Sequence, residues 1–246
     1  MMNTRVSSFL RRAVALWKKR GNLISCENPF SVLRGLLDGH AVSDVVDAGA
    51  SNGQISRKLL ARFPKARVHG FEPNPDYRAA LTAFAKEEPR FRPEFCALSD
   101  SDEDVELQCF ASPGINSIYT PNRRLRAYSP AGTESRTTVR VPCTTLDQWR
   151  ATRQVPGVQV IKLDIQGAEG RALRGASGLL REAVLAVYTE LLFNPLYEQG
   201  AIYSEIDLFL RQHGFALYSF YGPKTDARGL LLWGNAIYIQ PEKLGL

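Results

Sequence analysis

The sequence predicts an α/β fold: a mostly parallel sheet covered by helices on both faces. Short apolar segments such as residues 42–48 alternate with helical patterns such as residues 53–63 along most of the chain. Near the C-terminus, two apolar segments (215–222 and 230–239) flank a polar, glycine-containing turn, which predicts a hairpin with one antiparallel strand. The 246 residues are 44% hydrophobic and 23% charged, which is typical of a globular protein with a sizeable core.

The elements of the first half follow from local patterns. Residues 42–48 (VSDVVDA) predict a buried strand, and the helix after it has apolar residues at helical spacing and ends at Pro64. Residues 66–72 predict the next strand. Asn74–Pro75 predicts a helix start, with an N-cap followed by proline at the first helical position. Residues 91–98 predict a third strand.

The second half continues the alternation. Residues 158–164 (VQVIKLD) predict a fourth strand followed by a helix through Leu173, and residues 183–192 predict a fifth strand. Residues 204–214 predict a helix that ends in a glycine beyond its last turn. All of these elements fit one parallel sheet.

Between Asp100 and Trp149 the alternation breaks. Residues 103–110 and 137–143 are expected to form edge strands, and residues 112–135 between them a long loop. Structureless loops of that length usually carry function or are disordered.

The positive charge of the chain is concentrated at one end. The formal net charge is +6, but the first 20 residues carry six basic and no acidic side chains, and the remainder is balanced. A nucleic-acid face is therefore not implied. Residues 5–20 have an apolar stripe at helical spacing, which predicts a helix that packs on the domain, lies on an anionic membrane surface or binds a partner. We expect residues 1–40 to form this helix and a helical cap, and residues 41–246 the cofactor-binding domain.

The four cysteines are widely spaced and form no C-x-x-C pair, so the sequence predicts neither a metal site nor a disulfide framework. Reduced thiols in the cytoplasm are the simplest interpretation, with the membrane surface as a second location if residues 1–20 bind it. No apolar run approaches the roughly 18 residues of a membrane span. Two arginines interrupt the N-terminal apolar stretch, which argues against a signal peptide.

A glycine loop after the first strand indicates a cofactor site. Residues 45–54 read VVDAGASNGQ, with the pattern Asp47-x-Gly49-x-x-x-Gly53. Such loops lie at the carboxyl ends of parallel strands, where ligands bind. A phosphate-binding P-loop requires a lysine after its last glycine, and a dinucleotide loop requires a third glycine at other spacing. The acid at Asp47 instead suits a cofactor without phosphate, such as S-adenosylmethionine. Glu72, at the end of the second strand, can accept ribose hydroxyl bonds from either that cofactor or NAD.

The blocks DAGASNGQ (47–54), FEPNP (71–75), FCALSD (95–100) and KLDIQGAEGRALRGA (162–176) resemble the FkbM-type family of S-adenosylmethionine-dependent methyltransferases. The resemblance covers roughly residues 42–240. It implies a class I methyltransferase fold: a Rossmann-like three-layer sandwich with a mostly parallel seven-stranded sheet whose last strand is antiparallel. It also implies S-adenosyl-L-methionine as cofactor and, commonly in this family, methylation of hydroxyl groups on sugars, glycans, glycolipids or natural products.

The resemblance implies a set of cofactor residues. The methionine end should contact the glycine loop, the ribose Glu72 beside Pro73, and the adenine the segment after the third strand. By number, the expected residues are Asp47, Gly49, Ser51, Asn52, Gly53, Glu72, Pro73, Ala97, Leu98, Ser99 and Asp164.

Removal of a proton from a hydroxyl acceptor needs a base near the methyl group. Asp164 and Glu190 end the fourth and fifth strands and are the candidate catalytic carboxylates; Asp164 is equally expected to orient the cofactor. Many family members carry glutamate at the position of Gln166, which cannot ionise and receives no acid–base or metal role. Glu169 is expected in the first turn of the following helix. The three histidines are poorly placed to act as the base.

Aromatic and amide groups near the strand ends suit a small-molecule or glycan acceptor, and an arginine cluster in the long loop could bind a phosphate or carboxylate on it. The expected acceptor residues are Glu190, Asn194, Tyr197, Trp233, Asn235, Arg123, Arg124 and Arg126. Two alternatives stay open. One is an NAD-dependent oxidoreductase or epimerase, although the sequence contains neither a G-x-G-x-x-G loop nor a Tyr-x-x-x-Lys pair. The other is a non-catalytic binding module that keeps the same fold.

Overall fold

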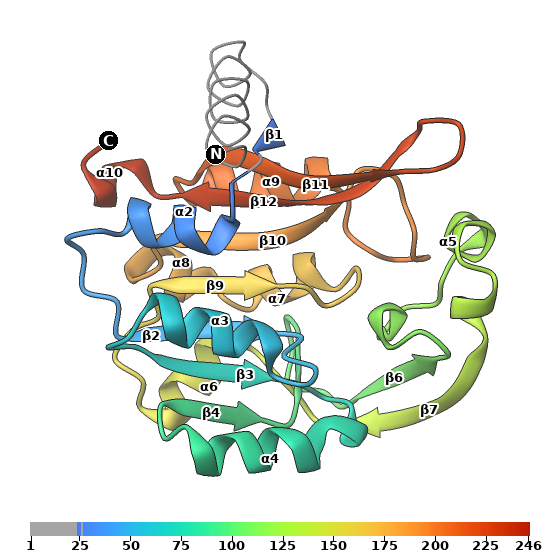
Figure 1. Ribbon diagram of the computed structural model, residues 1–246, viewed down its shortest axis with the longest axis horizontal. Coiled ribbons are helices and arrows are strands. Elements are labelled where there is room, and N and C mark those ends of the chain that lie inside the picture. The colour runs from blue at the N-terminus through green and yellow to red at the C-terminus, as the bar shows by residue number, and fades with distance from the viewer. Residues whose placement is uncertain (1–23, 26) are drawn as a thin grey trace, which may run out of the picture.

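A computed structural model describes residues 24–25 and 27–246 (Figure 1). The helix predicted at residues 5–20, its membrane contact and Cys26 lie outside the described residues. Within the described part of the chain, no helix is both long enough and apolar enough to cross a membrane.

The molecule is organised around one large sheet (Figure 1). β12 runs antiparallel to both of its neighbours, and every other pair in this sheet is parallel. In spatial order the strands are β1 (Ile24–Ser25), β11 (Ala216–Thr225), β12 (Leu231–Ile239), β10 (Ala186–Leu192), β9 (Val160–Leu163), β2 (Asp44–Ala48), β3 (Arg67–Phe71) and β4 (Phe91–Glu94). The predicted seven-stranded sheet with an antiparallel last strand is confirmed, and the two-residue β1 adds an eighth strand beside β11.

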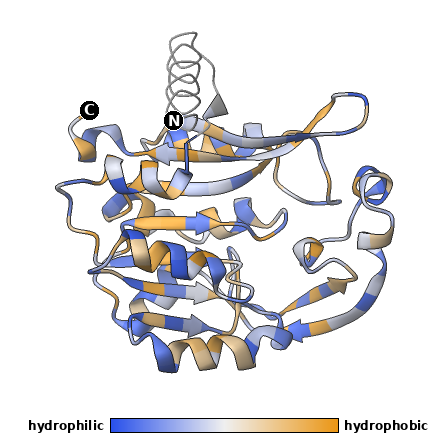
Figure 2. Cartoon of the chain, viewed as in Figure 1, coloured by the Kyte–Doolittle hydropathy of each residue, from blue (hydrophilic) through white to orange (hydrophobic). Residues whose placement is uncertain are grey.

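Helices cover both faces of this sheet and complete three layers. The first group of helices is α2 (Pro29–Leu36), α3 (Gln54–Arg62) and α4 (Arg78–Glu87), which contribute Phe30, Leu33, Leu59 and Phe84 to one apolar core. The second group is α6 (Leu146–Arg153), α7 (Glu169–Arg174), α8 (Ser177–Glu182) and α9 (Tyr203–Gln212), which contribute residues such as Trp149 to a second core. A short helix, α10 (Pro241–Leu244), follows the last strand. Figure 2 shows apolar residues concentrated on the central strands.

Side-chain caps start two helical segments, and the second of these starts was predicted from the sequence. The Asn28 side chain accepts bonds from the backbone N–H groups of Phe30 and Ser31, and Pro29 follows it at the first helical position. Asn74 caps a short 3₁₀ turn, Pro75–Tyr77, in the same way, and α4 continues from that turn. The predicted start at Asn74–Pro75 is therefore confirmed.

One strand prediction was wrong, and for two other strands the sequence did not identify the partner. Residues 91–98 do not form one strand: β4 stays in the main sheet, while β5 (Ala97–Leu98) pairs with β8 (Cys143–Thr144). The two expected edge strands are present as β6 (Val105–Phe110) and β7 (Ser135–Val141), and they pair with each other in a separate antiparallel sheet. Apolar periodicity identifies a strand but not its partner, so local patterns could not resolve this pairing.

The segment 112–135 is also more ordered than expected of a loop. It contains α5 (Arg123–Tyr128) and two 3₁₀ turns, Pro113–Ile115 and Ala131–Thr133. Asn122 caps α5 by accepting from the N–H groups of Arg124 and Leu125. Side chains of this segment pack against residues in and around β10 and form a small apolar cluster. The cluster contains Phe110, Ile115, Leu125, Leu192, Leu196, Tyr197 and Leu232.

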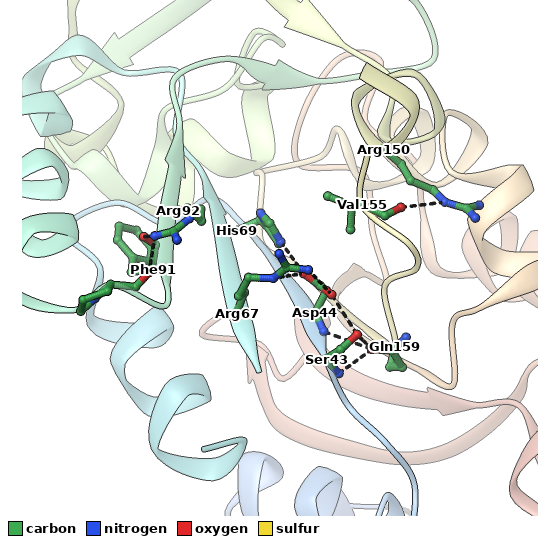
Figure 3. A network of polar contacts seen from close by, with 10 residues as sticks. Ser43, Asp44, Arg67, His69, Phe91, Arg92, Arg150, Val155 and Gln159 are labelled. Atoms are coloured by element: carbon green, nitrogen blue, oxygen red, sulfur yellow. Dashed lines mark hydrogen bonds and ion pairs between the residues drawn. The ribbon is translucent and has the colours of Figure 1, made fainter. Parts of the chain in front are cut away.

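A polar network lies at the amino ends of the central strands (Figure 3). Asp44 is fully buried, and its carboxylate accepts from Arg67 at 2.9 and 3.1 Å and from Ser43 at 2.8 Å, with His69 Nε2 2.9 Å away. Gln159 Oε1 accepts from the backbone N–H groups of Ser43 and Asp44. Burial alone would raise the pKa of Asp44, but the His69, Arg67 and Ser43 hydrogen bonds outweigh it and lower the pKa to about 2.

Candidate active site

A cavity of about 350 Å³ opens at the carboxyl ends of β2, β3 and β9. Its size lies in the range of small-molecule and cofactor sites. Most of the predicted cofactor residues border it, from the glycine loop, the end of β3 and the β5 segment. They are Gly49, Ser51, Asn52, Glu72, Pro73, Ala97, Leu98 and Asp164.

The glycine loop adopts a conformation that few residues permit. Gly49, Ser51 and Gly53 all have positive φ, at 76°, 49° and 82°. A Cβ added at Gly49 would lie 2.0 Å from the backbone oxygen of Asp164, so only glycine fits there. The loop after β2 is thus packed directly against the turn after β9.

Glu72 ties this loop to the end of β3. Its two carboxylate oxygens accept from the backbone N–H groups of Ser51 (2.7 Å) and Asn74 (2.9 Å). The residue is only 7% exposed, and burial raises its pKa, although both backbone bonds act in the opposite direction. Glu72 also borders the cavity, where its remaining lone pairs could accept ribose hydroxyl groups.

Asp47 does not border the cavity, although its ion-pair partner Lys162 does. Its carboxylate is fully buried, accepts from the Ser56 hydroxyl at 2.6 Å, and forms an ion pair with Lys162 at 2.9 Å. Gly53 and Ser99 are likewise buried and do not border the cavity. Contact of these three residues with a cofactor stays a prediction.

Lys162 is a site residue that sequence reasoning missed. It is 2% exposed and borders the cavity, and its ammonium donates to the backbone oxygens of Ala48 (3.0 Å) and Gly49 (3.1 Å). Buried lysines are almost always paired, so a lysine inside the apolar strand 160–163 was a usable signal. Burial opposes its charge, but the neighbouring carboxylates, Asp47 first, raise its pKa.

A second cavity, of about 230 Å³, adjoins the first. Three predicted acceptor residues, Glu190, Tyr197 and Trp233, border it. Its remaining wall is mainly apolar and comes from the 112–129 segment and the β10 region: Ser112, Gly114, Ile115, Leu125, Tyr128, Ser129, Gln166, Leu192 and Leu196. Gly114 and Gln166 border both cavities, so the two meet there.

The other predicted acceptor residues do not border this cavity. Asn194 donates to the backbone oxygen of Leu231 at 2.7 Å and ties the end of β10 to β12. Arg124 and Arg126 donate to the backbone oxygens of Pro195 and Pro121. Asn235 pairs with Glu190 in the sheet register, and Arg123 is exposed on α5. Their contact with an acceptor stays a prediction.

Gln166 joins the two candidate catalytic carboxylates. Its side-chain nitrogen donates to Asp164 Oδ1 at 2.8 Å and to Glu190 Oε2 at 3.3 Å. Its side-chain oxygen accepts from the Tyr197 hydroxyl at 2.9 Å. Sequence reasoning set Gln166 aside because it cannot ionise, and thereby overlooked its capacity to donate and accept at once.

Acidic groups dominate the surroundings of Gln166. Burial, then Asp164 and then Glu169, raise the pKa of Glu190 well above its usual value. Burial likewise raises the pKa of Glu169 to about 7, even though its carboxylate accepts from the N–H groups of Ile165 (2.8 Å) and Gly167 (2.9 Å). As predicted, Glu169 lies in the first turn of α7, and its bonds hold the turn after β9. A carboxylate with a raised pKa at a cavity wall is a candidate for proton transfer.

Comparison with known proteins agrees with this architecture. The mostly parallel central sheet with its antiparallel last strand is that of a class I methyltransferase fold. The chain matches the family model described as the Methyltransferase FkbM domain over residues 47–217, and it belongs to the FkbM methyltransferase family.

Individual relatives are more distant. The chain is 27% identical to the 2-O-methyltransferase NoeI of Sinorhizobium fredii (strain NBRC 101917 / NGR234) over 169 residues, which cover 63% of this chain and 65% of the relative. The crystal structure of methyltransferase FkbM from Methylobacillus flagellatus KT matches with a TM-score of 0.51 and 16% identity, covering 80% of this chain and 43% of that chain. The chain therefore spans just under two thirds of the curated relative and less than half of the solved structure.

Proposed function

We propose that the protein transfers a methyl group from S-adenosyl-L-methionine to a hydroxyl group of a sugar, glycan, glycolipid or natural-product acceptor. The observation that carries this proposal is the meeting of two cavities at Gln166, with a candidate base, Glu190, in the wall of the second. Membership of a methyltransferase family supports the reaction class. The similarity to a 2-O-methyltransferase supports oxygen as the methylated atom.

The charge around the first cavity favours a cationic cofactor. Glu72 and Asp164 border it, and Lys162, the only cation among its described lining residues, is paired with Asp47. A sulfonium ion would be attracted by these carboxylates, whereas the pyrophosphate of NAD would meet two acids and no arginine. Glu72 would hold the ribose, and the loop 49–52 the methionine end, of S-adenosylmethionine.

The cofactor, when bound, supplies an electrophilic methyl group for in-line displacement. The protein's contribution is positioning and proton removal. Tyr128, Leu192 and Trp233 would pack against the acceptor in the second cavity, with its hydroxyl directed toward Gln166 and Glu190. Glu190 would then take the hydroxyl proton as the oxygen forms its bond to carbon, and its raised pKa makes it a stronger base.

Two measurements test the proposal. Isothermal titration calorimetry should detect S-adenosylhomocysteine binding and no NAD binding; binding of NAD alone would overturn the cofactor assignment. A labelled-methyl assay against monosaccharides, oligosaccharides and glycolipids should then find a methylated product in which the label is on oxygen. Transfer exclusively to amines would overturn the acceptor class.

The arginine cluster of α5 is a separate part of this proposal. Arg123 is exposed on α5, the helix that also supplies Leu125 and Tyr128 to the wall of the second cavity. If the acceptor carries a phosphate or carboxylate, the triple change Arg123→Ala, Arg124→Ala, Arg126→Ala should raise the acceptor KM and leave S-adenosylhomocysteine affinity unchanged. Weakened cofactor binding alone would contradict this role.

A further inference from the structure

Gln166 lies where the two cavities and the two candidate catalytic carboxylates meet. We propose that Gln166 is a positioning residue whose amide holds Asp164 and Glu190 in fixed orientation and keeps Glu190 able to accept a proton. Its link to methyl transfer rests on the proposed function, whereas its effect on Glu190 can be measured without turnover.

The hydrogen bonds define which way the amide points. When ionised, the two carboxylates can only accept, so in that state both face the NH₂ group of Gln166, and one NH₂ group has two hydrogens to give. The Tyr197 hydroxyl donates to the opposite end of the amide at 2.9 Å. Tyr197 is itself 2% exposed, so this bond is shielded from water. Every polar atom of the Gln166 side chain is therefore engaged.

The backbone holds Gln166 just as firmly. Gln166 and Gly167 both have positive φ, at 57° and 96°, and the Glu169 carboxylate accepts from the N–H groups on either side of Gln166. Ser117 donates to the Gln166 backbone oxygen at 2.7 Å. A Cβ at Gly167 would lie 3.0 Å from the Tyr197 ring, so the turn and that ring are in close contact. A non-glycine residue held at positive φ is strained, and such strain is common at functional sites.

The charges that face Glu190 explain why a neutral bridge is needed. Lys162 lies on β9, Asp164 directly follows that strand, and Glu169 lies on α7. Tyr188 lies on β10 and Tyr197 on the segment after it. Lys162 is the one cation among these described groups, and it is paired with Asp47. Hydrogen bonds donated to a carboxylate favour its charged form, so the Gln166 amide offsets part of the repulsion from Asp164 and Glu169.

Two substitutions separate the parts of this role. Gln166→Glu keeps the size and shape of the side chain but removes the NH₂ donors and adds a third acid to the group. Gln166→Leu removes the donors without adding charge. Tyr197→Phe leaves the amide in place and removes only the hydroxyl group that fixes its direction, while the ring still packs on Gly167.

The decisive measurement is a ¹³C carboxyl NMR titration of the full chain, with Glu190 assigned by its loss in Glu190→Gln. We expect the Glu190 titration midpoint to rise by about one pH unit in Gln166→Leu and by more in Gln166→Glu, since both lost donors and added charge disfavour the carboxylate. A smaller rise is expected in Tyr197→Phe. Midpoints equal to wild type in both Gln166 variants would overturn the inference. Should Gln166→Leu fail to fold, Gln166→Met, which also removes the donors without adding charge, takes its place.

Activity supplies the second measurement. In Gln166→Glu, kcat should fall at least about tenfold at pH 7 and partly recover at higher pH, with S-adenosylhomocysteine affinity within about threefold of wild type. An unchanged pH profile would overturn the role in catalysis. The two proposals fail separately: shifted NMR midpoints in a protein that transfers no methyl group to any hydroxyl would sink only the proposed function. Unshifted midpoints in an active enzyme would sink only the inference.

Discussion

Two buried carboxylates at opposite ends of the same sheet show contrasting electrostatics. Asp44, fully buried at the amino end of β2, is surrounded by Arg67, His69 and Ser43, and its pKa is lowered to about 2. Glu190, 8% exposed near the carboxyl end of β10, is surrounded mainly by acids, and its pKa is raised. One end of the sheet neutralises its buried charge, whereas the other concentrates charge of one sign.

Under the proposed function, this contrast separates a structural carboxylate, Asp44, from a catalytic one, Glu190. A buried charge costs free energy unless it is paired, so an acid held among other acids is not there for stability. Ligands of open parallel sheets bind at the carboxyl ends of the strands, which is where this uncompensated charge lies. The raised pKa of Glu190 is therefore informative, because Asp44 in the same sheet shows the lowered pKa of a buried carboxylate that is paired.

The largest expected effect is on catalysis. Glu190→Gln should lower kcat for methyl transfer by roughly 10² to 10⁴-fold, the usual contribution of a general base, and leave S-adenosylhomocysteine affinity nearly unchanged. Steady-state kinetics with a labelled methyl group and calorimetry measure the two quantities. Full activity in this variant would remove Glu190 from the reaction.

Glu190→Gln should not lower the free energy of unfolding, unlike the substitution of a buried carboxylate that stabilises the fold. Because the folded-state pKa of Glu190 is raised, its charge destabilises the fold above the unfolded-state value and has no effect below that value. The variant should then be at least as stable as wild type at pH 7, with the difference vanishing toward pH 4. Urea unfolding at both pH values measures this, and a clear loss of stability at pH 7 would contradict the comparison.

Lys162→Met should cause the largest loss of stability. It would leave the Asp47 carboxylate buried and unpaired, which costs about 3–5 kcal/mol. The matched control is Lys58→Met, since Lys58 is exposed on α3 and its loss should cost under about 0.5 kcal/mol. Urea unfolding of both variants measures the difference. Equal stabilities would show that the ion pair does not support the glycine loop, whereas adding Asp47→Asn should recover part of the loss.

Asp44→Asn should destabilise the fold by a smaller amount that depends on pH. A pKa lowered from 3.8 to about 2 corresponds to about 2 kcal/mol of stability at neutral pH. That contribution is complete above pH 3.8 and is lost as the pH falls through 3.8 toward 2. Wild-type stability should therefore fall more steeply than that of Asp44→Asn over this interval, as followed by urea midpoints. Parallel curves would show that Asp44 is not stabilised by its partners.

The smallest effect is expected from Ser43→Ala. It removes one hydroxyl hydrogen bond to Asp44 while Arg67 and His69 continue to pair with the carboxylate. A loss of about 1 kcal/mol at pH 7 is expected from thermal or urea unfolding. A loss as large as that of Asp44→Asn would mean that Ser43, rather than Arg67 and His69, dominates the network.

The sequence predicted the sheet and the strand-end acids because both depend on local patterns. Apolar periodicity located the strands, and Asp164 and Glu190 were identified because they end strands that must meet at one edge. The pairing of β5 with β8, and of β6 with β7, could not be predicted in this way, since pairing is decided by contacts distant in sequence.

The site details that were missed depend on register and on distant partners. Lys162 lies directly opposite Asp47 in the β2–β9 register, a relation between residues 115 positions apart that no local spacing encodes. Gln166 acquires its role only because Tyr197 and Glu190 approach it in the folded chain. The residue type correctly shows that Gln166 cannot ionise, but only the fold shows which groups its amide contacts.

The Lys162 side chain has a consequence for ligand binding. Its ammonium, carried by β9, contacts the Asp47 carboxylate and the Ala48 and Gly49 carbonyls at the end of β2. The shape of the glycine loop is thereby set when the sheet forms, before any ligand arrives. A preorganised loop loses little conformational entropy on binding. The binding free energy of the cofactor then comes from direct contacts and is reduced only slightly by the cost of ordering the loop.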